Sequence, residues 1–390
     1  MKLKHHFMKS TVILSMVAST ALYATNGDTL VGVGAKTRAM GGAGIAFSHG
    51  AESTLVNPAL ITHVQDTEIS FGGTIFMPSI KTETPMSGGK KSKSDADISM
   101  IPAVAAVSHL DNGLHIGAGM WGTAGMGTDF RGHPDLFDME TTLQLMQFAV
   151  PVAYKFGGLS LGIAPILQYG SLDIHYNYGG TNVGDGQHQD FGLGASLGAT
   201  YDFGTGFTVG AVYKTKIKMD YGNAIPTATA PFGLSFGSHL DQPAEFGIGL
   251  GWRSGPHGIA IDWKRILWSH ATGYKEFNWD DQDVFAIGYQ YDAGTWSARI
   301  GFNHGKTPIK ASGNPAIDMF NLLGFPATQE NHFTLGGTYA FSKNFSADVT
   351  AVYGFNKDSS ADVSAMFGSG AQVKNKHSEL GLTVQLNYKF

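Results

Sequence analysis

The sequence predicts an all-β fold: a 14-stranded antiparallel transmembrane β-barrel with an N-terminal plug inside its lumen. Three observations predict this fold. The last residues of the chain alternate strictly between apolar and polar side chains. Only 15% of the 390 residues are charged, whereas 53 are Gly and 12% are aromatic, and no transmembrane-length apolar run follows the N-terminus. Fourteen alternating segments divide residues 67–390, and bacterial single-chain barrels have an even number of strands.

The C-terminal stretch, residues 379–390, sets the pattern. Its apolar face consists of Leu380, Leu382, Val384, Leu386, Tyr388 and Phe390. Strict alternation with period two predicts a strand with one apolar face. The terminal aromatics are typical of a lipid-facing strand that ends at the membrane interface, and a final Phe resembles the C-terminal signal of outer-membrane assembly. On this stretch alone, a half-buried strand of a soluble β-sandwich remains the alternative.

The N-terminus predicts a secretory signal peptide over residues 1–24. A basic region with three lysines precedes an apolar run over residues 11–18, and cleavage is expected after Ala21 or Ala24. Export combined with amphipathic strands indicates the outer membrane of a Gram-negative bacterium. The net charge of −5 argues against a nucleic-acid partner, and the lack of Cys excludes a disulfide framework.

Residues 25–66 differ from the strands that follow them. They are rich in Gly, Ala, Val and Leu, carry few charges and contain no long alternating segment. A disordered tail is expected to be more polar, so we interpret the segment as a plug within a barrel formed by residues 67–390.

The barrel strands follow from alternation and turn residues. They are expected at 67–80, 97–109, 113–124, 141–156, 158–176, 188–203, 206–219, 242–254, 257–269, 281–292, 295–304, 329–341, 344–356 and 376–390. In segment 141–156 the alternation slips near Gln147, which predicts a β-bulge there.

The connections alternate in length along the chain. Tight turns are expected at 110–113, 157–158, 204–206, 254–256, 293–294 and 342–344, and long loops at 81–96, 125–140, 177–187, 220–241, 270–280, 305–328 and 357–375. Short turns are periplasmic in such barrels. Aromatic residues cluster beside the short turns and predict an interfacial girdle: Tyr154, Phe156, Tyr201, Phe203, Tyr291, Trp296, Tyr339 and Phe341.

The inward faces of two strands are rich in glycine. Gly192, Gly194 and Gly198 point inward in segment 188–203, and 242–254 carries a similar row. Inward glycines leave room for a plug packed against the wall, or they relieve crowding where the sheet curves tightly. The sequence leaves both interpretations open.

Two runs of the N-terminal segment carry a resemblance to a known family. Residues 38–46, Arg-Ala-Met-Gly-Gly-Ala-Gly-Ile-Ala, are followed by residues 57–62, Asn-Pro-Ala-Leu-Ile-Thr. Together they resemble the hatch of the FadL family, outer-membrane transporters of long-chain fatty acids and hydrocarbons. The resemblance extends from about residue 25 to 390. It implies that residues 25–66 block the lumen and that Asn57, Pro58 and Ala59 form the hatch or gate.

The resemblance also implies a side opening in the barrel wall. In the FadL family the third strand is kinked inward beside such an opening, and the matching strand here is the glycine-dense segment 113–124. The residues assigned to the lateral opening are Gly117, Gly119, Gly122 and Gly125. The chain departs from the fatty-acid members in loop 177–187, which is short, and in segment 158–176, which has no Arg. Both departures favour a neutral hydrocarbon or aromatic ligand.

No catalytic constellation is evident. Residues 194–198 match the pattern G-x-S-x-G, but they lie within a strand and not on the strand-to-helix turn that a nucleophile elbow needs. None of the 15 His residues has metal-ligand spacing. We therefore expect no enzyme activity, no metal and no cofactor.

Three lysines, Lys214, Lys216 and Lys218, share the inward face of the predicted strand 206–219. Like charges on one strand face repel each other unless they are partnered. They are possible carboxylate partners of a ligand. Alternatively, they form salt bridges to inward acids such as Asp202, Asp220 or Asp262, or they are solvated near the outer rim.

The resulting hypothesis is outer-membrane uptake of hydrophobic compounds, long-chain fatty acids or hydrocarbons and aromatics, by facilitated diffusion. Ligand-lining residues are expected in two loops: Met126, Leu136, Phe137, Met139, Pro231, Phe232, Leu234 and Phe236. Ligand would then pass a moving hatch and leave beside the third strand. Expected partners are the hydrophobic ligand and outer-membrane lipid and lipopolysaccharide, and we expect a monomer. The alternatives are a general diffusion porin and a surface antigen or receptor without a transport role.

Overall fold

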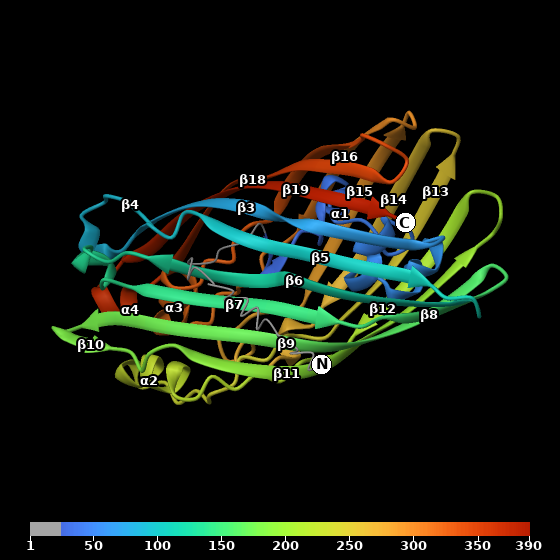
Figure 1. Ribbon diagram of the computed structural model, residues 1–390. Helices are drawn as coiled ribbons and strands as arrows, with labels where there is room; N and C mark the ends of the chain where they lie inside the picture. Colours follow the sequence, from blue (N-terminus) through green and yellow to red (C-terminus); the bar gives the residue numbers. More distant parts are fainter. Residues whose placement is uncertain (1–24) are drawn as a thin grey trace, which may run out of the picture.

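The computed structural model describes residues 25–390, so the predicted signal peptide with its cleavage after Ala21 or Ala24 lies outside the described residues. Within them the chain forms a closed antiparallel barrel of 14 strands, if β7 and β8 are counted as one interrupted strand (Figure 1). The barrel closes where β19 pairs with β3, from Glu68 opposite Lys389 to Glu83 opposite Lys374. The predicted fold class is confirmed.

The wall consists of β3 (Thr67–Glu83), β5 (Ser99–His109), β6 (Leu114–Asp129), β7 (Glu140–Ala149), β8 (Val152–Phe156), β9 (Leu159–Tyr178), β11 (His188–Asp202), β12 (Phe207–Lys214), β13 (Glu245–Ser254), β14 (His257–Ile266), β15 (Gln282–Asp292), β16 (Trp296–Gly305), β17 (Asn331–Ala340), β18 (Phe345–Asp362) and β19 (Gln372–Lys389). Short strands are β1 (Thr25–Asn26), β2 (Thr29–Leu30), β4 (Ser92–Lys93) and β10 (Thr181–Val183). The helices are α1 (Ala35–Ala39), α2 (Ala224–Thr229), α3 (Pro315–Leu323) and α4 (Ser364–Phe367). Short 3-10 helices span Gly50–Leu55, Pro58–His63, Pro85–Ser87, Pro134–Leu136, Ala230–Phe232 and Trp268–His270.

Each expected strand overlaps an observed one, with four main differences. Strand β6 continues to Asp129, five residues into the stretch expected as a loop, so Gly125 and Met126 lie in a strand. The fourth strand is interrupted between Ala149 and Val152, not near Gln147, because Pro151 has no N–H to donate to the ladder. Strand β12 ends at Lys214, five residues earlier than expected. The last hairpin is longer than expected, since β18 continues to Asp362 and β19 begins at Gln372.

The two ends of the barrel differ as the loop lengths predict. The short turns and the C-terminus lie at one end, and α2, α4, β4 and β10 lie at the other (Figure 1). The expected girdle aromatics are exposed beside the short turns, for example Phe341, and neighbours pack in pairs such as Tyr201 with Phe203. Bulky apolar side chains continue along the outer face, where Leu193 is 78% exposed. Such a face suits contact with lipid.

Among residues 25–390, no helix is long and apolar enough to cross a membrane.

The N-terminal segment, residues 25–66, lies within the ring of strands and touches the wall at glycines. At eleven inward positions an added Cβ would lie less than 3.0 Å from an atom of the segment: Gly162, Gly198, Gly210, Gly247, Gly249, Gly251, Gly258, Gly288, Gly301, Gly336 and Gly381. These glycines come from β9 and β11 to β17, and from β19. The observed contacts favour room for the segment over relief of sheet curvature as the reason for the inward glycines.

Candidate functional site

The loop end of the barrel contains a small apolar pocket, which we call the outer pocket. Its cavity of about 20 Å³ is lined by Met126, Leu172, Ile174, Ile225, Leu240, Tyr274, Phe277, Trp279, Asn321 and Phe325. The Asn321 amide donates to the carbonyl of Phe277 at 2.8 Å and accepts from Nε1 of Trp279 at 2.9 Å. The hydroxyl of Tyr274 donates to Asp28. The polar side chains of the outer pocket are therefore paired with protein groups, and the surface it offers is apolar.

Aromatic rings hold the pocket wall in place. Trp268, Tyr274 and Trp279 form a cluster with ring centroids 4.7–5.0 Å apart. The ring of Trp268 also packs against Gly27, where an added Cβ would lie 2.5 Å from it. Phe277 is further supported by Phe236 at 4.9 Å. The 270–280 loop thus joins the outer pocket to the start of the N-terminal segment.

Asp28 links the N-terminal segment to both sides of the lumen. Its carboxylate accepts from Tyr274, which lines the outer pocket, and from Nε2 of Gln242 at 3.1 Å. Its carbonyl accepts from the N–H of Gly125 in β6 at 3.0 Å, and Thr29 pairs with Ala124. Burial raises the pKa of Asp28 to about 6, against the opposing effect of these hydrogen bonds.

A second cavity, which we call the inner cavity, lies beyond this anchor. It has a volume of about 100 Å³, and its lining includes Thr29, Leu30, Gln147, Ile166, Lys214, Ile217, Gln242, Glu245 and Lys264. Residues 28–30 therefore lie between the two cavities, with Asp28 bonded to the wall of the outer pocket and Leu30 lining the inner cavity.

The three lysines do not share an inward face as predicted. Beyond Lys214 the chain leaves the sheet, and the expected alternation is lost, so Ile217 is buried and not outward-facing. The Lys214 ammonium lies 2.8 Å from Glu245, which also faces Lys264 at 3.6 Å. Lys216 lies 3.4 Å from Asp241, whereas Lys218 is exposed and makes no ion pair within residues 25–390.

The three acids that were expected to form salt bridges with these lysines have other contacts. Asp262 accepts from the N–H groups of Gly44 and Ile45 at 2.6 and 2.9 Å, and so binds the N-terminal segment. Asp202 and Asp220 accept from the turn N–H groups of Gly204 and Gly222. The salt bridges that the sequence suggested exist for two lysines, but with Glu245 and Asp241.

Strand β6 is irregular in the stretch where the family resemblance implied a kink. Its register with β7 shifts between Gly122 and Ala124. Its pairing with the antiparallel β5 ends where Trp121 lies opposite Ala103, so the first residues of β5, from Ser99 on, have no partner on β6. The buried ring of Trp121 covers Gly119, where an added Cβ would lie 1.8 Å from the ring.

The glycines assigned to the lateral opening have different surroundings. Gly117 faces Pro151 and Ala106, and Gly125 donates to Asp28. An apolar groove of about 720 Å³ follows the wall beside Gly119, and its lining includes Ala118, Met120, Phe148, Val150, Pro165, Ile166 and Leu193. Ile166 also lines the inner cavity, so the two spaces have one lining residue in common.

Asn57, Pro58 and Ala59 lie against β9 and β11. Asn57 caps the following 3-10 helix by accepting from the N–H of Ala59 at 3.1 Å, and it donates to the carbonyl of Ile45 at 2.7 Å. An added Cβ at Gly198 would lie 1.9 Å from the Asn57 Oδ1, and one at Gly162 would lie 2.5 Å from Pro58. These residues fix the segment to two wall strands.

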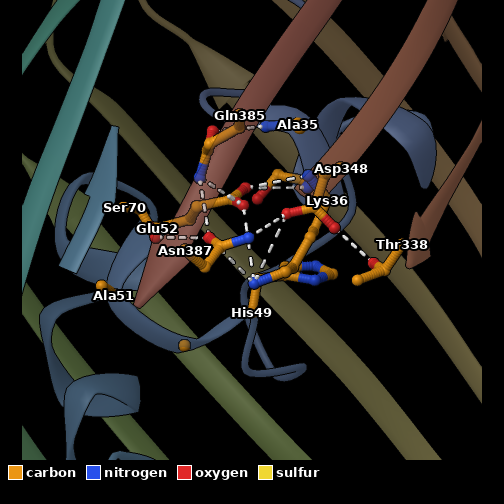
Figure 2. A network of polar contacts seen from close by, with 12 residues as sticks. Ala35, Lys36, His49, Ala51, Glu52, Ser70, Thr338, Asp348, Gln385 and Asn387 are labelled. Atoms are coloured by element: carbon orange, nitrogen blue, oxygen red, sulfur yellow. Dashed lines mark hydrogen bonds and ion pairs between the residues drawn. The ribbon is translucent and has the colours of Figure 1, made fainter. Parts of the chain in front are cut away.

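Polar contacts hold the short-turn end of the segment. Figure 2 shows the Lys36 ammonium between the carboxylates of Glu52 from the segment and Asp348 from the wall, which lie 3.9 and 3.8 Å from it. The carboxylate of Glu68 lies 3.8 Å from the same ammonium. Glu52 accepts from Gln385 of β19 at 2.8 Å and from the N–H of Lys36 at 3.0 Å.

Burial sets the charge states within this network. It raises the pKa of Glu52 to about 8, although the nearby Lys36 acts in the opposite direction. Burial alone would lower the pKa of Lys36, but Asp348, Glu52 and Glu68 outweigh it and raise that pKa. Burial lowers the pKa of the neighbouring His49 to about 3, which keeps its imidazole neutral.

The ligand-lining residues expected from the sequence are only partly brought together. Met126 lines the outer pocket, while Leu136, Phe137 and Met139 are buried in the core beside it. Phe232 and Phe236 pack against that core, Leu234 is half-buried and Pro231 is exposed. The 270–280 loop and α3 supply lining residues that sequence reasoning missed. The aromatic density of 270–280 was the available signal.

Comparisons with known proteins bear on the whole chain. A family model described as outer membrane protein transport protein (OMPP1/FadL/TodX) matches residues 11–252 and 262–390. The Pseudomonas putida toluene transporter TodX is similar in structure, with a TM-score of 0.70 and 19% identity over 94% of this chain and 100% of its own. A Pseudomonas aeruginosa FadL homologue has a TM-score of 0.73 and is 14% identical in sequence. The match covers 94% of this chain and 100% of the homologue. The Ralstonia pickettii toluene transporter TbuX has a TM-score of 0.68 and is 18% identical in sequence. The match covers 92% of this chain and 99% of TbuX.

One curated sequence also matches. It is a Chlorobium limicola protein described as an uncharacterized protein in the phosphoenolpyruvate carboxykinase gene 5′ region, 35% identical over 91 residues. The match covers 23% of this chain and 43% of the relative, so the chain spans less than half of that relative's length.

Proposed function

This chain belongs to the OMPP1/FadL/TodX family of Gram-negative outer-membrane transport proteins, as its hatch-like motif suggested, and we propose that it takes up neutral apolar molecules by facilitated diffusion. The family is one of transport proteins and not of enzymes. The observation that carries the proposal is the outer pocket, whose lining is apolar and whose polar side chains are already paired. An apolar solute that widens this small pocket would leave no polar group of its own unpaired, whereas a carboxylate would be left without a partner.

The names of similar structures agree with a neutral ligand. TodX and TbuX are described as toluene transporters. The connection from β9 to β11, residues 179–187, is short, and the family resemblance takes this as a departure from the fatty-acid members. We therefore favour hydrocarbons or monoaromatics over long-chain fatty acids.

We propose that residues 25–66 act as a hatch that must shift for passage. Residues 28–30 lie between the outer pocket and the inner cavity, so their displacement would connect the two. Asn57, Pro58 and Ala59 hold the deeper part of the hatch against β9 and β11. The many contacts at these three residues suggest a local shift near Asp28, with the deeper part held in place.

We propose that exit is lateral, beside β6. Three observations support this: the loss of β5–β6 pairing beyond Trp121, the apolar groove next to Gly119, and the shared lining residue Ile166. A lateral exit delivers an apolar molecule to the lipid without passage through water. Lys214 and Lys264 share one acid at the inner cavity, so a carboxylate ligand, if it reached that point, would compete with Glu245.

The test is binding to the purified barrel in detergent, with a monoaromatic hydrocarbon, an alkane and a long-chain fatty acid compared. Neutral ligands are expected to bind, and Phe277→Ala is expected to weaken them roughly 10- to 100-fold, since a buried Phe contributes about 1.5–3 kcal/mol. Phe341→Ala is the matched control, because Phe341 is 62% exposed at the opposite rim.

The fatty-acid arm separates two parts of the proposal. If the protein prefers the fatty acid and Lys214→Met abolishes this preference, the proposed ligand changes from a neutral molecule to a carboxylate. The proposal of a transport function then still stands. Absence of binding for all three ligands in the parent protein would overturn the proposal itself and favour a receptor role.

A further inference from the structure

Lysines from adjacent strands meet on the outer face of the barrel. The register places Lys81 of β3 directly opposite both Lys376 of β19 and Lys93 of β4. Their neighbours Ile80, Ser92 and His377 are buried, so the lysines project away from the lumen. Like charges directly opposite each other destabilise a strand pair, so such a row calls for a compensating anion.

Nearby acids neutralise only part of this charge. Asp97 lies 2.6 Å from Lys93, and Asp358, which is opposite Lys376 in the register, pairs with Lys91 at 3.6 Å. Lys374 is paired with Glu83 at 2.9 Å. Over the chain from residue 25 to 390, Lys81 and Lys376 make no ion pair.

The lysine pair lies just beyond the apolar band. On the outer face, Ile75 is opposite Leu382 and Met77 is opposite Leu380, followed by Ser79 opposite Ser378 and then Lys81 opposite Lys376. Both strands therefore change from apolar to hydroxyl to cation in the same steps. Lys81 lies four residues, about 13 Å of strand, beyond Met77. This end carries the long loops and faces the cell exterior in such barrels.

We infer that Lys81 and Lys376 form a binding site for the phosphate groups of the outer-leaflet glycolipid, lipopolysaccharide. Two ammonium groups on directly paired residues can converge on one phosphate, which supplies the missing counter-charge. The apolar face immediately below them, with Ile75 and Leu382 exposed, would pack against the acyl chains of the same lipid. One lipid thus satisfies both the charge and the apolar surface.

The test counts lipids on the full barrel by native mass spectrometry during titration with diphosphoryl lipid A. The double variant Lys81→Gln/Lys376→Gln is expected to bind about 25-fold more weakly, from roughly fivefold per lysine near an anionic surface. Lys81→Arg/Lys376→Arg is expected to keep binding. The control Lys155→Gln/Lys343→Gln removes two exposed lysines from the short-turn rim and is expected to bind as the parent does.

Two further arms identify the source of the phosphate. Lipid A without its phosphates is expected to bind the parent about as weakly as diphosphoryl lipid A binds the Gln variant. Inorganic phosphate at millimolar concentration is expected not to compete with diphosphoryl lipid A. Unchanged affinity in the Gln variant, or equal binding of the phosphate-free lipid, overturns the inference. Competition by inorganic phosphate would assign a free-anion site and also overturn it. Retained hydrocarbon binding by the Gln variant keeps this result separate from the transport proposal.

Discussion

At the scale of single residues, Asp28 makes docking of the first hatch residues dependent on pH. Its folded pKa is about 6 against an ordinary value of 3.8, so the docked state binds a proton more tightly than the undocked state does. Docking is therefore strongest below about pH 3.8 and weakens as pH rises through about 6. The rise in the pKa of Asp28 from 3.8 to about 6 corresponds to about 3 kcal/mol in the free energy of docking.

Hydrogen exchange over residues 25–30, corrected for the intrinsic rate at each pH, measures this effect. Opening is expected to become more frequent between pH 4 and 7 in the parent. Asp28→Asn is expected to abolish the dependence, because Gln242 has an unpaired Oε1 that can turn to accept from the new amide. The exposed Asp111→Asn is the control. A flat profile in the parent would contradict the prediction.

At the scale of elements, α1 and the 3-10 helix Gly50–Leu55 are joined to the wall through Lys36. Lys36→Met removes the cation shared by Glu52, Glu68 and Asp348. Loss of one partner from a buried ion pair costs about 3–5 kcal/mol when the remaining charge is left uncompensated. The cost here is expected to be smaller, because Asp348 also faces Arg299 at 3.8 Å and Glu68 also faces Lys389 at 3.7 Å. We expect local undocking of residues 35–54 while the strand ladder stays intact.

Limited proteolysis and hydrogen exchange in this region check the expectation. Lys343→Met, an exposed lysine at the same rim, is the matched control. Equal protection of residues 35–54 in both variants would show that glycine contacts, and not the Lys36 network, hold the segment.

At the scale of the whole molecule, the segment inside the barrel decides whether the lumen conducts ions. In planar bilayers the intact protein is expected to show conductance near the baseline. A variant lacking residues 25–63 is expected to open a steady pore, because those residues contact the wall from β9 round to β19. Heat-modifiable mobility in electrophoresis would establish that the shortened barrel is folded. Large conductance of the intact protein would instead favour the general diffusion porin.

The strands and their orientation could be predicted because each depends on local sequence. Period-two alternation placed the wall strands, and turn residues together with neighbouring aromatics distinguished the two rims. The chain around Lys214 shows where this reasoning fails. Alternation assigns a face only while the strand continues, and the point at which β12 leaves the sheet is set by packing of Ile217 under Gly192 and Gly194.

What the sequence by itself determined is therefore the barrel, its strand count, its two ends and, through the motif at residues 57–62, its family. What only the tertiary structure decided is which residues meet inside it. Asp28 and Tyr274 are 246 residues apart in sequence, and Lys81 and Lys376 pair only because the last strand closes on the first. Local periodicity specifies the face of a strand, but contacts across a lumen depend on the closure and register of all the strands together.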